Sequence, residues 1–295
     1  MGRFAPSPTG PLHFGSLVAA VASYAQAKSQ GGRWLLRIED IDPPREVAGA
    51  SDEILRALEH YGFEWDGEVC YQSRRHLAYE AALEQLYQHR WVYPCRCSRK
   101  MVRQLSERGI YPGTCRHAAP AEAGSFPFQG YAMRVLSAGP VRSFRDVVQG
   151  DVSEDLQREV GDFVVRRADG LWAYQLAIVV DDAEQGVTEV VRGADLLAST
   201  ARQIHLQHLL GYPSPSYFHL PVVMGDNGEK LSKQGGAPAL TAGDSLPVLI
   251  RALGFLNQPL FGLESAADLQ QFWLEVFKRW QADRVPSLPS CRPRI

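Results

Sequence analysis

The chain of 295 residues lacks the features of a membrane or secreted protein. No apolar run approaches the roughly 20 residues that a membrane-spanning helix requires. The sequence opens with Arg3 followed by prolines, whereas a signal peptide would continue into an apolar core. We therefore expect a cytoplasmic protein with no membrane partner. Repeats and low-complexity tracts are also absent, which argues against a solenoid or a disordered chain.

The chain also lacks an excess of basic residues, because 31 Lys and Arg are balanced by 33 Asp and Glu, for a net charge of −2. A nucleic-acid partner would therefore need a local basic face. Cysteine is scarce, with five in all, and three of them fall between residues 95 and 115. In a chain without an export signal, such a cluster predicts a metal site before it predicts disulfides.

What the sequence does have is a distinctive start, in which an apolar-leaning segment passes through a Pro/Gly-rich turn into a predicted helix over 16–29. The backbone N–H groups and the dipole at a helix start favour an anion. Gly10 and Gly15 place no Cβ in the way of a ligand, and His13 can donate a hydrogen bond to a phosphate oxygen. This order of elements predicts a phosphate site.

A second segment of interest is Lys230–Gln234, which reads KLSKQ and follows a predicted strand over 218–224. On its own this segment indicates a charged surface hairpin. With the N-terminal stretch, however, it resembles the second of two ATP-binding signatures of class I aminoacyl-tRNA synthetases, the first being His13-Phe14-Gly15-Ser16. The flank from Arg3 to Gly10 is similar to the glutamyl/glutaminyl branch. Ser16 departs from the usual His, Asn or Thr, and serine retains a hydrogen-bonding hydroxyl.

The resemblance implies which residues bind ATP and stabilise the charge on its phosphates. His13 and Lys233 would be catalytic, because both can donate to phosphate oxygens as charge moves onto pyrophosphate. Mg²⁺ is expected to accompany ATP. The implied ATP-binding residues are His13, Gly15, Ser16, Lys230, Leu231, Ser232, Lys233 and Gln234.

The predicted fold is α/β: a class I synthetase-type Rossmann catalytic domain with a parallel sheet, a zinc-bearing α+β insert and a small C-terminal helical region. A buried strand over 34–38 completes a βαβ unit with the N-terminal segment. Strands are expected at 163–167 and 171–176, and helices at 199–210, 246–256 and 266–280. The expected domains are 1–94 with 163–239 (catalytic), 95–162 (insert) and 240–295 (helical).

Cys95, Cys97 and Cys115 supply three thiols, and Zn²⁺ prefers four ligands in a tetrahedron. The fourth ligand could be His117 or the phenolate of Tyr111, and chemistry alone favours the imidazole. Three reduced cysteines without metal are the alternative. The Cys-x-Cys…Tyr-x-x-x-Cys pattern is similar to that of the short glutamyl-queuosine tRNA(Asp) synthetases, and this resemblance implies Tyr111 as the fourth ligand of one structural zinc per chain.

Arginine forks suit carboxylates, and Arg3 and Arg192 lie at predicted strand ends where they could converge on one ligand. Glu39 could balance an ammonium group, and Tyr174 could donate a hydrogen bond. The resemblance to the glutamyl-queuosine family implies that a larger set binds glutamate. That set is Arg3, Phe4, Ala5, Pro6, Ser7, Glu39, Tyr174 and Arg192.

The resemblance implies tRNA-independent activation of L-glutamate to glutamyl-adenylate, then transfer to the queuosine at the wobble position of tRNA(Asp). The roughly sixty residues after Gly236 are too few for an anticodon-reading module of typical domain size. We expect a monomer. The alternatives are a truncated glutamyl-tRNA synthetase that charges an acceptor end and a non-catalytic zinc-bearing RNA-binding module. A nucleotidylyltransferase, which lacks an amino-acid pocket, fits less well.

Overall fold

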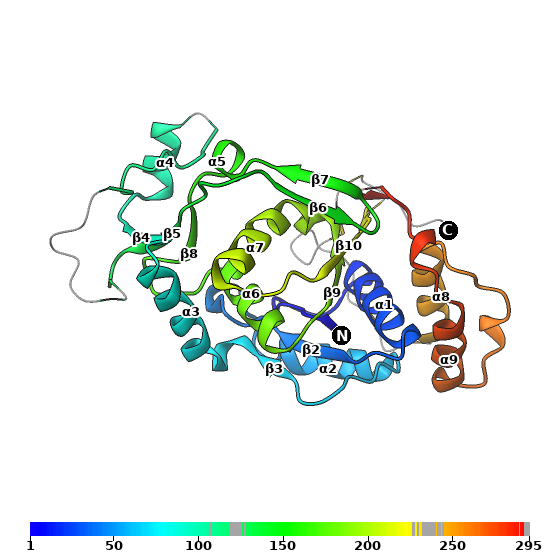
Figure 1. Ribbon diagram of the computed structural model, residues 1–295. Coiled ribbons are helices and arrows are strands. Elements are labelled where there is room, and N and C mark those ends of the chain that lie inside the picture. Colours follow the sequence, from blue (N-terminus) through cyan, green and yellow to red (C-terminus); the bar gives the residue numbers. More distant parts are fainter. Residues whose placement is uncertain are drawn as a thin grey trace.

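The computed structural model describes residues 1–106, 108–117, 126, 128–225, 228, 230–231, 240, 243, 245–288 and 290–291. Structural statements below concern these residues. The fold has three main sheets, with helices packed against them (Figure 1). Within the described ranges, no helix combines the length and apolar character needed to cross a bilayer.

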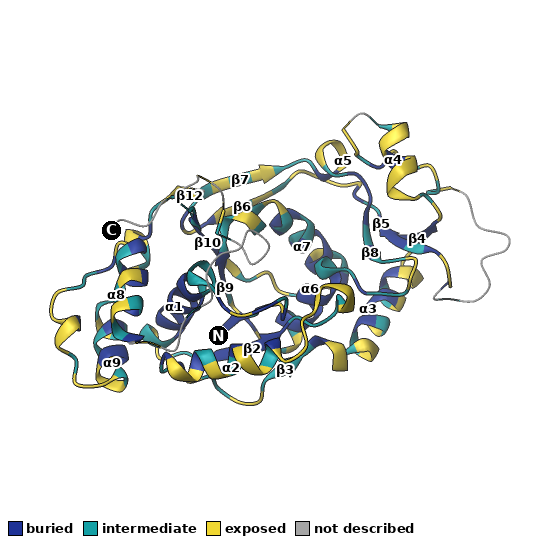
Figure 2. Cartoon of the chain, turned by 180° about the vertical axis from the view of Figure 1, so that it is seen from behind, coloured by how far each residue is buried: buried dark blue, intermediate teal, exposed yellow. Residues whose placement is uncertain are grey.

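The N-terminal βαβ unit is formed as the sequence predicts. Strand β1 (Gly2–Phe4) pairs in parallel with β2 (Trp34–Ile38), which pairs with the short β3 (Cys70–Tyr71). All five residues of β2 are buried, which confirms the predicted strand. Helix α1 (Phe14–Ser29) connects β1 to β2 and buries ten residues, so it forms the centre of the core (Figure 2).

Helix α1 starts two residues earlier than predicted, because His13 occupies the N-cap position in an extended conformation. The Nδ1 atom of His13 accepts a hydrogen bond from the Ser16 backbone N–H at 3.3 Å. Such a bond satisfies one of the N–H groups that a helix start leaves without a partner. The C-terminal end of α1 at Ser29 is as predicted, and Gly31 follows it with a φ of 65°.

The second sheet has the order β7-β6-β10-β9. Strands β9 (Glu189–Gly193) and β10 (Ser216–Leu220) are parallel, and β10 also pairs in parallel with β6 (Arg142–Asp146), the partner of antiparallel β7 (Gly150–Glu154). The N–H groups of Thr188 and Glu189 donate to the Met1 carbonyl at 3.0 and 3.1 Å. The start of β9 is therefore bonded to the residue before β1, and the two sheets meet there.

The region 171–176 was predicted as a strand, and this prediction is wrong. Helix α6 (Tyr174–Glu184) begins there, and only Trp172 forms a bridge to β8 (Phe163–Arg166), opposite Arg166. A short apolar run does not distinguish a buried strand from a buried helix, because neither shows a polar face. Residues 176–182 are all buried, so this helix has no periodic pattern that the sequence could reveal.

A third, antiparallel sheet has the order β4-β5-β8 and lies at one end of the molecule near α4 and α5 (Figure 1). Its strands span both sides of the predicted insert boundaries, and the division into domains stays a prediction. The bounds here are β4 Val92–Cys95, β5 Ala132–Val135, β8 Phe163–Arg166, α3 His76–Gln88, α4 Arg99–Leu105 and α5 Leu156–Glu159.

The other end of the molecule carries α8 (Ser245–Phe255) and α9 (Leu269–Arg279), which confirm the two predicted C-terminal helices (Figure 1). Trp273 of α9 packs on Tyr24 of α1, with ring centroids 4.9 Å apart. The predicted strand over 218–224 is divided after β10, and its second part is β11 (Val222–Val223), which pairs with β12 (Ser290–Cys291). The remaining helices are α2 (Ala50–His60), α7 (Leu197–Leu210) and 3-10 turns at 43–45, 72–74, 194–196, 263–265 and 282–284.

Candidate active site

A cavity of about 420 Å³ opens where the loop after β1, the start of α1 and the ends of β9 and β10 meet. Every residue predicted to bind glutamate or ATP lines this cavity, with three exceptions at the end of Lys230–Gln234, the lysine segment. Ser232, Lys233 and Gln234 lie outside the described residues. The lining residues from the prediction are Arg3, Phe4, Ala5, Pro6, Ser7, His13, Gly15, Ser16, Glu39, Tyr174, Arg192, Lys230 and Leu231.

The start of α1 is shaped by His13 and Gly15. A Cβ atom on Gly15 would lie 3.0 Å from Cε1 and 3.2 Å from Nδ1 of His13, which is tighter than ordinary contacts. Glycine at this position lets the imidazole lie against the helix start. Because Nδ1 accepts from Ser16, the neutral ring carries its proton on Nε2, and donation to a ligand comes from that atom.

The described part of the lysine segment lies beside this helix start. The same Cβ position on Gly15 is 3.7 Å from the Leu231 carbonyl oxygen, and the Leu231 N–H donates to the Val223 carbonyl at 2.9 Å. The ammonium group of Lys230 donates to Asp195 at 2.6 Å. The two segments that resemble the class I signatures therefore share one cavity, although more than 200 residues separate them in sequence.

Arg3 reaches the cavity from a buried network of charges. Its Nε donates to Asp182 at 3.2 Å, and Asp182 also accepts from Arg37 at 2.5 Å. Burial opposes ionisation of Asp182, but the positive charges of Arg3 and Arg37 outweigh it and lower the pKa of this carboxyl. Sequence reasoning assigned no role to Asp182, although two adjacent acids in an apolar run are a signal of buried cationic partners.

Glu39 follows the C-terminal end of β2, and its Oε1 is buried with no hydrogen-bond partner in the described parts of the chain. Burial raises the pKa of Glu39 to about 7, and Arg37 and Arg3 offset only part of this effect. Asp182 and Asp181 raise the pKa further by repulsion. A carboxylate in these surroundings gains most when a cation enters the cavity, which fits the predicted ammonium partner.

Arg192 is the last but one residue of β9, on the other side of the cavity, and its Nη1 donates to the Tyr174 hydroxyl at 3.3 Å. Tyr174 begins α6, and burial raises the pKa of its hydroxyl. The hydroxyl is therefore protonated at neutral pH and can donate in turn. The structure thus brings together two guanidinium groups, one carboxylate and one phenol around a single cavity.

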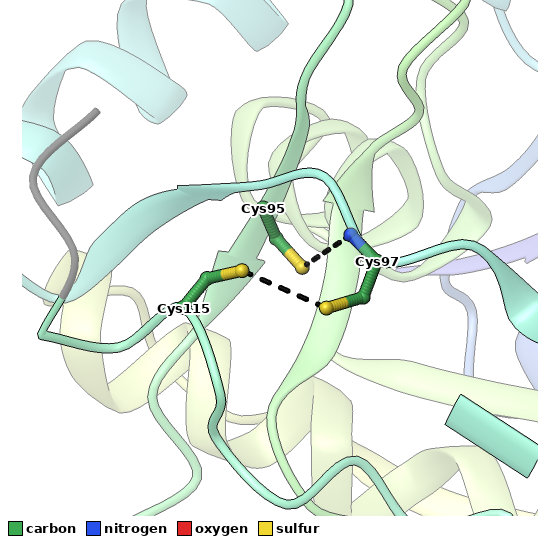
Figure 3. Close-up of side chains that lie close together, drawn as sticks. All are labelled: Cys95, Cys97 and Cys115. Atoms are coloured by element: carbon green, nitrogen blue, oxygen red, sulfur yellow. Dashed lines mark hydrogen bonds between the residues drawn. The ribbon is translucent and has the colours of Figure 1, made fainter. Parts of the chain in front are cut away.

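The three cysteine sulfurs Cys95, Cys97 and Cys115 lie within 4.8 Å of one another at the end of β4 (Figure 3). The sulfurs of Cys97 and Cys115 are 3.6 Å apart. Tetrahedral zinc with Zn–S bonds of about 2.3 Å requires sulfurs about 3.8 Å apart, so this spacing fits Zn²⁺. The group can hold a metal ion.

Tyr111 lies closer to this cysteine group than His117 does. Its hydroxyl is 3.3 Å from the Cys95 sulfur and 3.9 Å from the Cys97 sulfur. His117 is exposed and does not join the group of possible ligands. Arg134 donates to the Cys95 sulfur at 3.3 Å. The geometry therefore favours Tyr111, in line with the resemblance and against the preference from chemistry alone.

Comparisons with known proteins agree with the site. A family model described as the catalytic domain of class I tRNA synthetases (E and Q) matches residues 1–248. Proteins named glutamyl-Q tRNA(Asp) synthetase are similar over nearly their whole length. That of Serratia proteamaculans is 53% identical over 97% of this chain and 92% of its own. That of Chromobacterium violaceum is 51% identical over 98% of this chain and 96% of its own.

Among solved structures, the glutamate-tRNA synthetase of Elizabethkingia anophelis is similar with a TM-score of 0.80 and 25% identity, over 98% of this chain and 67% of its own. A glutamate tRNA ligase from Elizabethkingia meningosepticum, solved in complex with its amino acid, is similar with a TM-score of 0.80 and 26% identity. The match covers 99% of this chain and 66% of the ligase chain. These matches confirm the predicted α/β class I fold. The chain belongs to the glutamyl-Q tRNA(Asp) synthetase family and is a ligase of the class I aminoacyl-tRNA synthetase type.

Proposed function

We propose that this enzyme activates L-glutamate with ATP in the absence of tRNA and then transfers the glutamyl group to the queuosine at the wobble position of tRNA(Asp). One observation carries the proposal. A single cavity is lined both by groups suited to glutamate and by groups suited to phosphates. The similarity to glutamyl-Q tRNA(Asp) synthetases over nearly the full length of both chains supports the choice of acceptor.

The charges around the cavity complement those of glutamate. Glutamate carries two carboxylates and one ammonium group, and the cavity offers the guanidinium groups of Arg3 and Arg192 and the carboxylate of Glu39. Each charge of the amino acid can therefore be paired. Because planar guanidinium groups bind carboxylates through two parallel hydrogen bonds, they also fix the orientation of the ligand.

The phosphate side of the cavity would bind ATP, with Mg²⁺ bound to its phosphates as class I chemistry implies. A glutamate carboxylate oxygen attacks the α-phosphorus, and the bond from the α-phosphorus to the bridging oxygen breaks to release pyrophosphate. His13, donating from Nε2, and Lys230 would stabilise the charge that develops on the leaving group. We assign the same role to Lys233 on the resemblance alone.

The acceptor step would follow at the same place. A hydroxyl of queuosine attacks the carbonyl carbon of glutamyl-adenylate, a new ester bond forms, and AMP leaves. Positioning supplies most of such a rate enhancement, because the reactants are already activated. The zinc site would act at a distance from this chemistry. Cys95, Cys97, Tyr111 and Cys115 would hold the ion, which would tie β4 to the segment around residue 115.

A second candidate is aminoacylation of a tRNA acceptor end, because the solved glutamate-tRNA synthetases share the fold. This chain spans about two thirds of their length, whereas it spans nine tenths or more of the glutamyl-Q tRNA(Asp) synthetases quoted above. The difference in coverage favours the queuosine acceptor.

Glutamate-dependent ATP–pyrophosphate exchange without tRNA tests the proposal. We expect exchange with L-glutamate, much less with L-glutamine or L-aspartate, and a large loss of the maximal rate in His13→Ala. Removing one hydrogen-bond donor to a developing charge typically lowers kcat by about 10²- to 10³-fold. An absence of exchange until tRNA is added would contradict tRNA-independent activation.

A further inference from the structure

Arg192 is held by more partners than sequence reasoning foresaw. It is only 6% exposed. Its Nε donates to Nε2 of His219 at 3.1 Å, and its Nη2 donates to the Thr200 hydroxyl at 2.8 Å. His219 Nε2 and the Thr200 hydroxyl are themselves 3.1 Å apart. These two residues therefore occupy the Nε and Nη2 edge of the guanidinium group.

The remaining donors of Arg192 follow from its chemistry. A guanidinium group has five N–H donors, and His219, Thr200 and Tyr174 take three of them. Two donors stay without a partner among the described residues, one on Nη1 and one on Nη2. This pair forms the end of the fork that binds both oxygens of a carboxylate, and Arg192 lines the cavity.

The proton positions on His219 can be deduced. Arg192 can only donate, so Nε2 of His219 must accept, and the proton lies on Nδ1. Nδ1 is 2.6 Å from Oδ2 of Asp146 and donates to it. His219 is fully buried, and burial together with the charge of Arg192 lowers its pKa below the ordinary value. The ring therefore stays neutral, as its role as acceptor requires.

Asp146 is fixed by the turn that follows β6. Its Oδ1 accepts from the backbone N–H groups of Val148 at 3.0 Å and Gln149 at 2.8 Å, and the residue is 1% exposed. The parallel pairing of β6 with β10 places Asp146 opposite Tyr217, two residues before His219 on β10. A continuous series of hydrogen bonds thus leads from a rigid turn through Asp146 and His219 to Arg192.

We propose that His219 and Asp146 are positioning residues for substrate binding, because they fix the rotation of the Arg192 guanidinium group so that its Nη1/Nη2 end meets a substrate carboxylate. The inference rests on the proposed function, in which that carboxylate belongs to glutamate. The alternative is that the same bonds only stabilise the second sheet. A structural role would affect stability and both substrates alike, whereas a positioning role affects glutamate selectively.

The test compares His219→Asn with His219→Gln in glutamate-dependent pyrophosphate exchange. Asparagine can keep a donor to Asp146 near the position of Nδ1, but it is too short to accept from Arg192. Glutamine places its amide oxygen near the former Nε2. A buried donor left without an acceptor typically weakens binding by about tenfold to hundredfold, and we expect this rise in the KM for glutamate in His219→Asn. In His219→Gln most of the loss should be restored, and the KM for ATP should stay within about twofold in both.

His205→Asn is a matched control. His205 is also buried, it contacts an arginine through Nδ1 (Arg142, at 2.9 Å) where His219 uses Nε2, and it does not line the cavity. We expect an unchanged KM for glutamate in this variant. If His219→Asn fails to fold, Thr200→Val removes a hydroxyl from the same edge of Arg192 at nearly constant volume and should also raise the KM for glutamate.

The outcomes separate the two levels of the proposal. Wild-type protein without glutamate-dependent exchange would overturn the proposed function. Wild-type exchange with an unchanged glutamate KM in His219→Asn or Thr200→Val would overturn the positioning role alone. Equal rises in the KM values for glutamate and ATP, or the same rise in His205→Asn, would also overturn it, because they indicate a general loss of structure.

Discussion

Glutamate binding should weaken as the pH falls from 8 to 6, because the ammonium group of the ligand requires an ionised Glu39. Burial raises the pKa of Glu39 to about 7 in the ligand-free protein; Arg37 and Arg3 offset part of this rise, and repulsion from Asp182 and Asp181 adds to it. With this pKa, about nine tenths of Glu39 is ionised at pH 8 and about one tenth at pH 6. The dissociation constant for glutamate should therefore rise roughly tenfold over this interval.

Isothermal titration calorimetry with L-glutamate alone, at pH 6, 7 and 8, measures this effect without ATP or tRNA. Glu39→Gln is the control, since it keeps the shape of the side chain and every other titrating group. We expect this variant to bind glutamate at least about tenfold more weakly at pH 8, because it lacks the charge that pairs with the ammonium group. Its dissociation constant should change little with pH.

Two results would refute the reasoning. One is an equal dissociation constant for the wild type at pH 6 and pH 8. The other is a pH dependence of Glu39→Gln as steep as that of the wild type, since another group would then be responsible. The stability of the free protein offers an independent check. The folded-state pKa lies above the ordinary value of 4.5, so the contribution of Glu39 to the free energy of unfolding should decrease as the pH rises from about 4.5 to about 7.

Three further predictions concern Arg3, the cysteine group and Gly161. Arg3→Ala should raise the KM for glutamate in pyrophosphate exchange by about tenfold or more and leave the KM for ATP nearly unchanged, and an unchanged glutamate KM would count against its role. The wild type should contain about one zinc per chain by elemental analysis, and Cys97→Ser should lower both the zinc content and the Tm; undamaged, unchelated protein without zinc would contradict the site. Gly161→Ala should destabilise the protein by about 1 to 3 kcal/mol in denaturant unfolding, because the new Cβ would lie 2.7 Å from the Tyr111 carbonyl oxygen at a φ of +71°, and unchanged stability would show that the backbone relaxes.

The sequence was most informative where local chemistry determines the backbone. The buried run 34–38 is a strand, and Gly31 ends the first helix, as turn and packing rules require. The residues assigned to ligand binding from the two signature segments do line one cavity as far as the structure describes them. These assignments came from the resemblance to the class I synthetase signatures, which names the residues that meet although they are far apart in the sequence.

The rest depends on contacts between distant segments, which local patterns do not encode. Asp146 and His219 are 73 residues apart and meet only because β6 pairs with β10. The helix that carries Tyr174 was mistaken for a strand because its buried run, 176–182, has no polar face and therefore no helical periodicity. Chemistry alone favoured His117 over Tyr111 as the fourth ligand, and the fold favours Tyr111 because its hydroxyl points toward the sulfurs.

The acceptor assay tests the central claim most directly. Purified enzyme, ATP and radiolabelled glutamate are incubated with tRNA(Asp) containing queuosine, with the same tRNA lacking queuosine, and with tRNA(Glu). We predict that label is incorporated only into the queuosine-containing tRNA(Asp), and that prior periodate oxidation of the cyclopentene diol abolishes it. Label at the acceptor end of tRNA(Glu), or equal labelling of tRNA(Asp) with and without queuosine, would contradict the account.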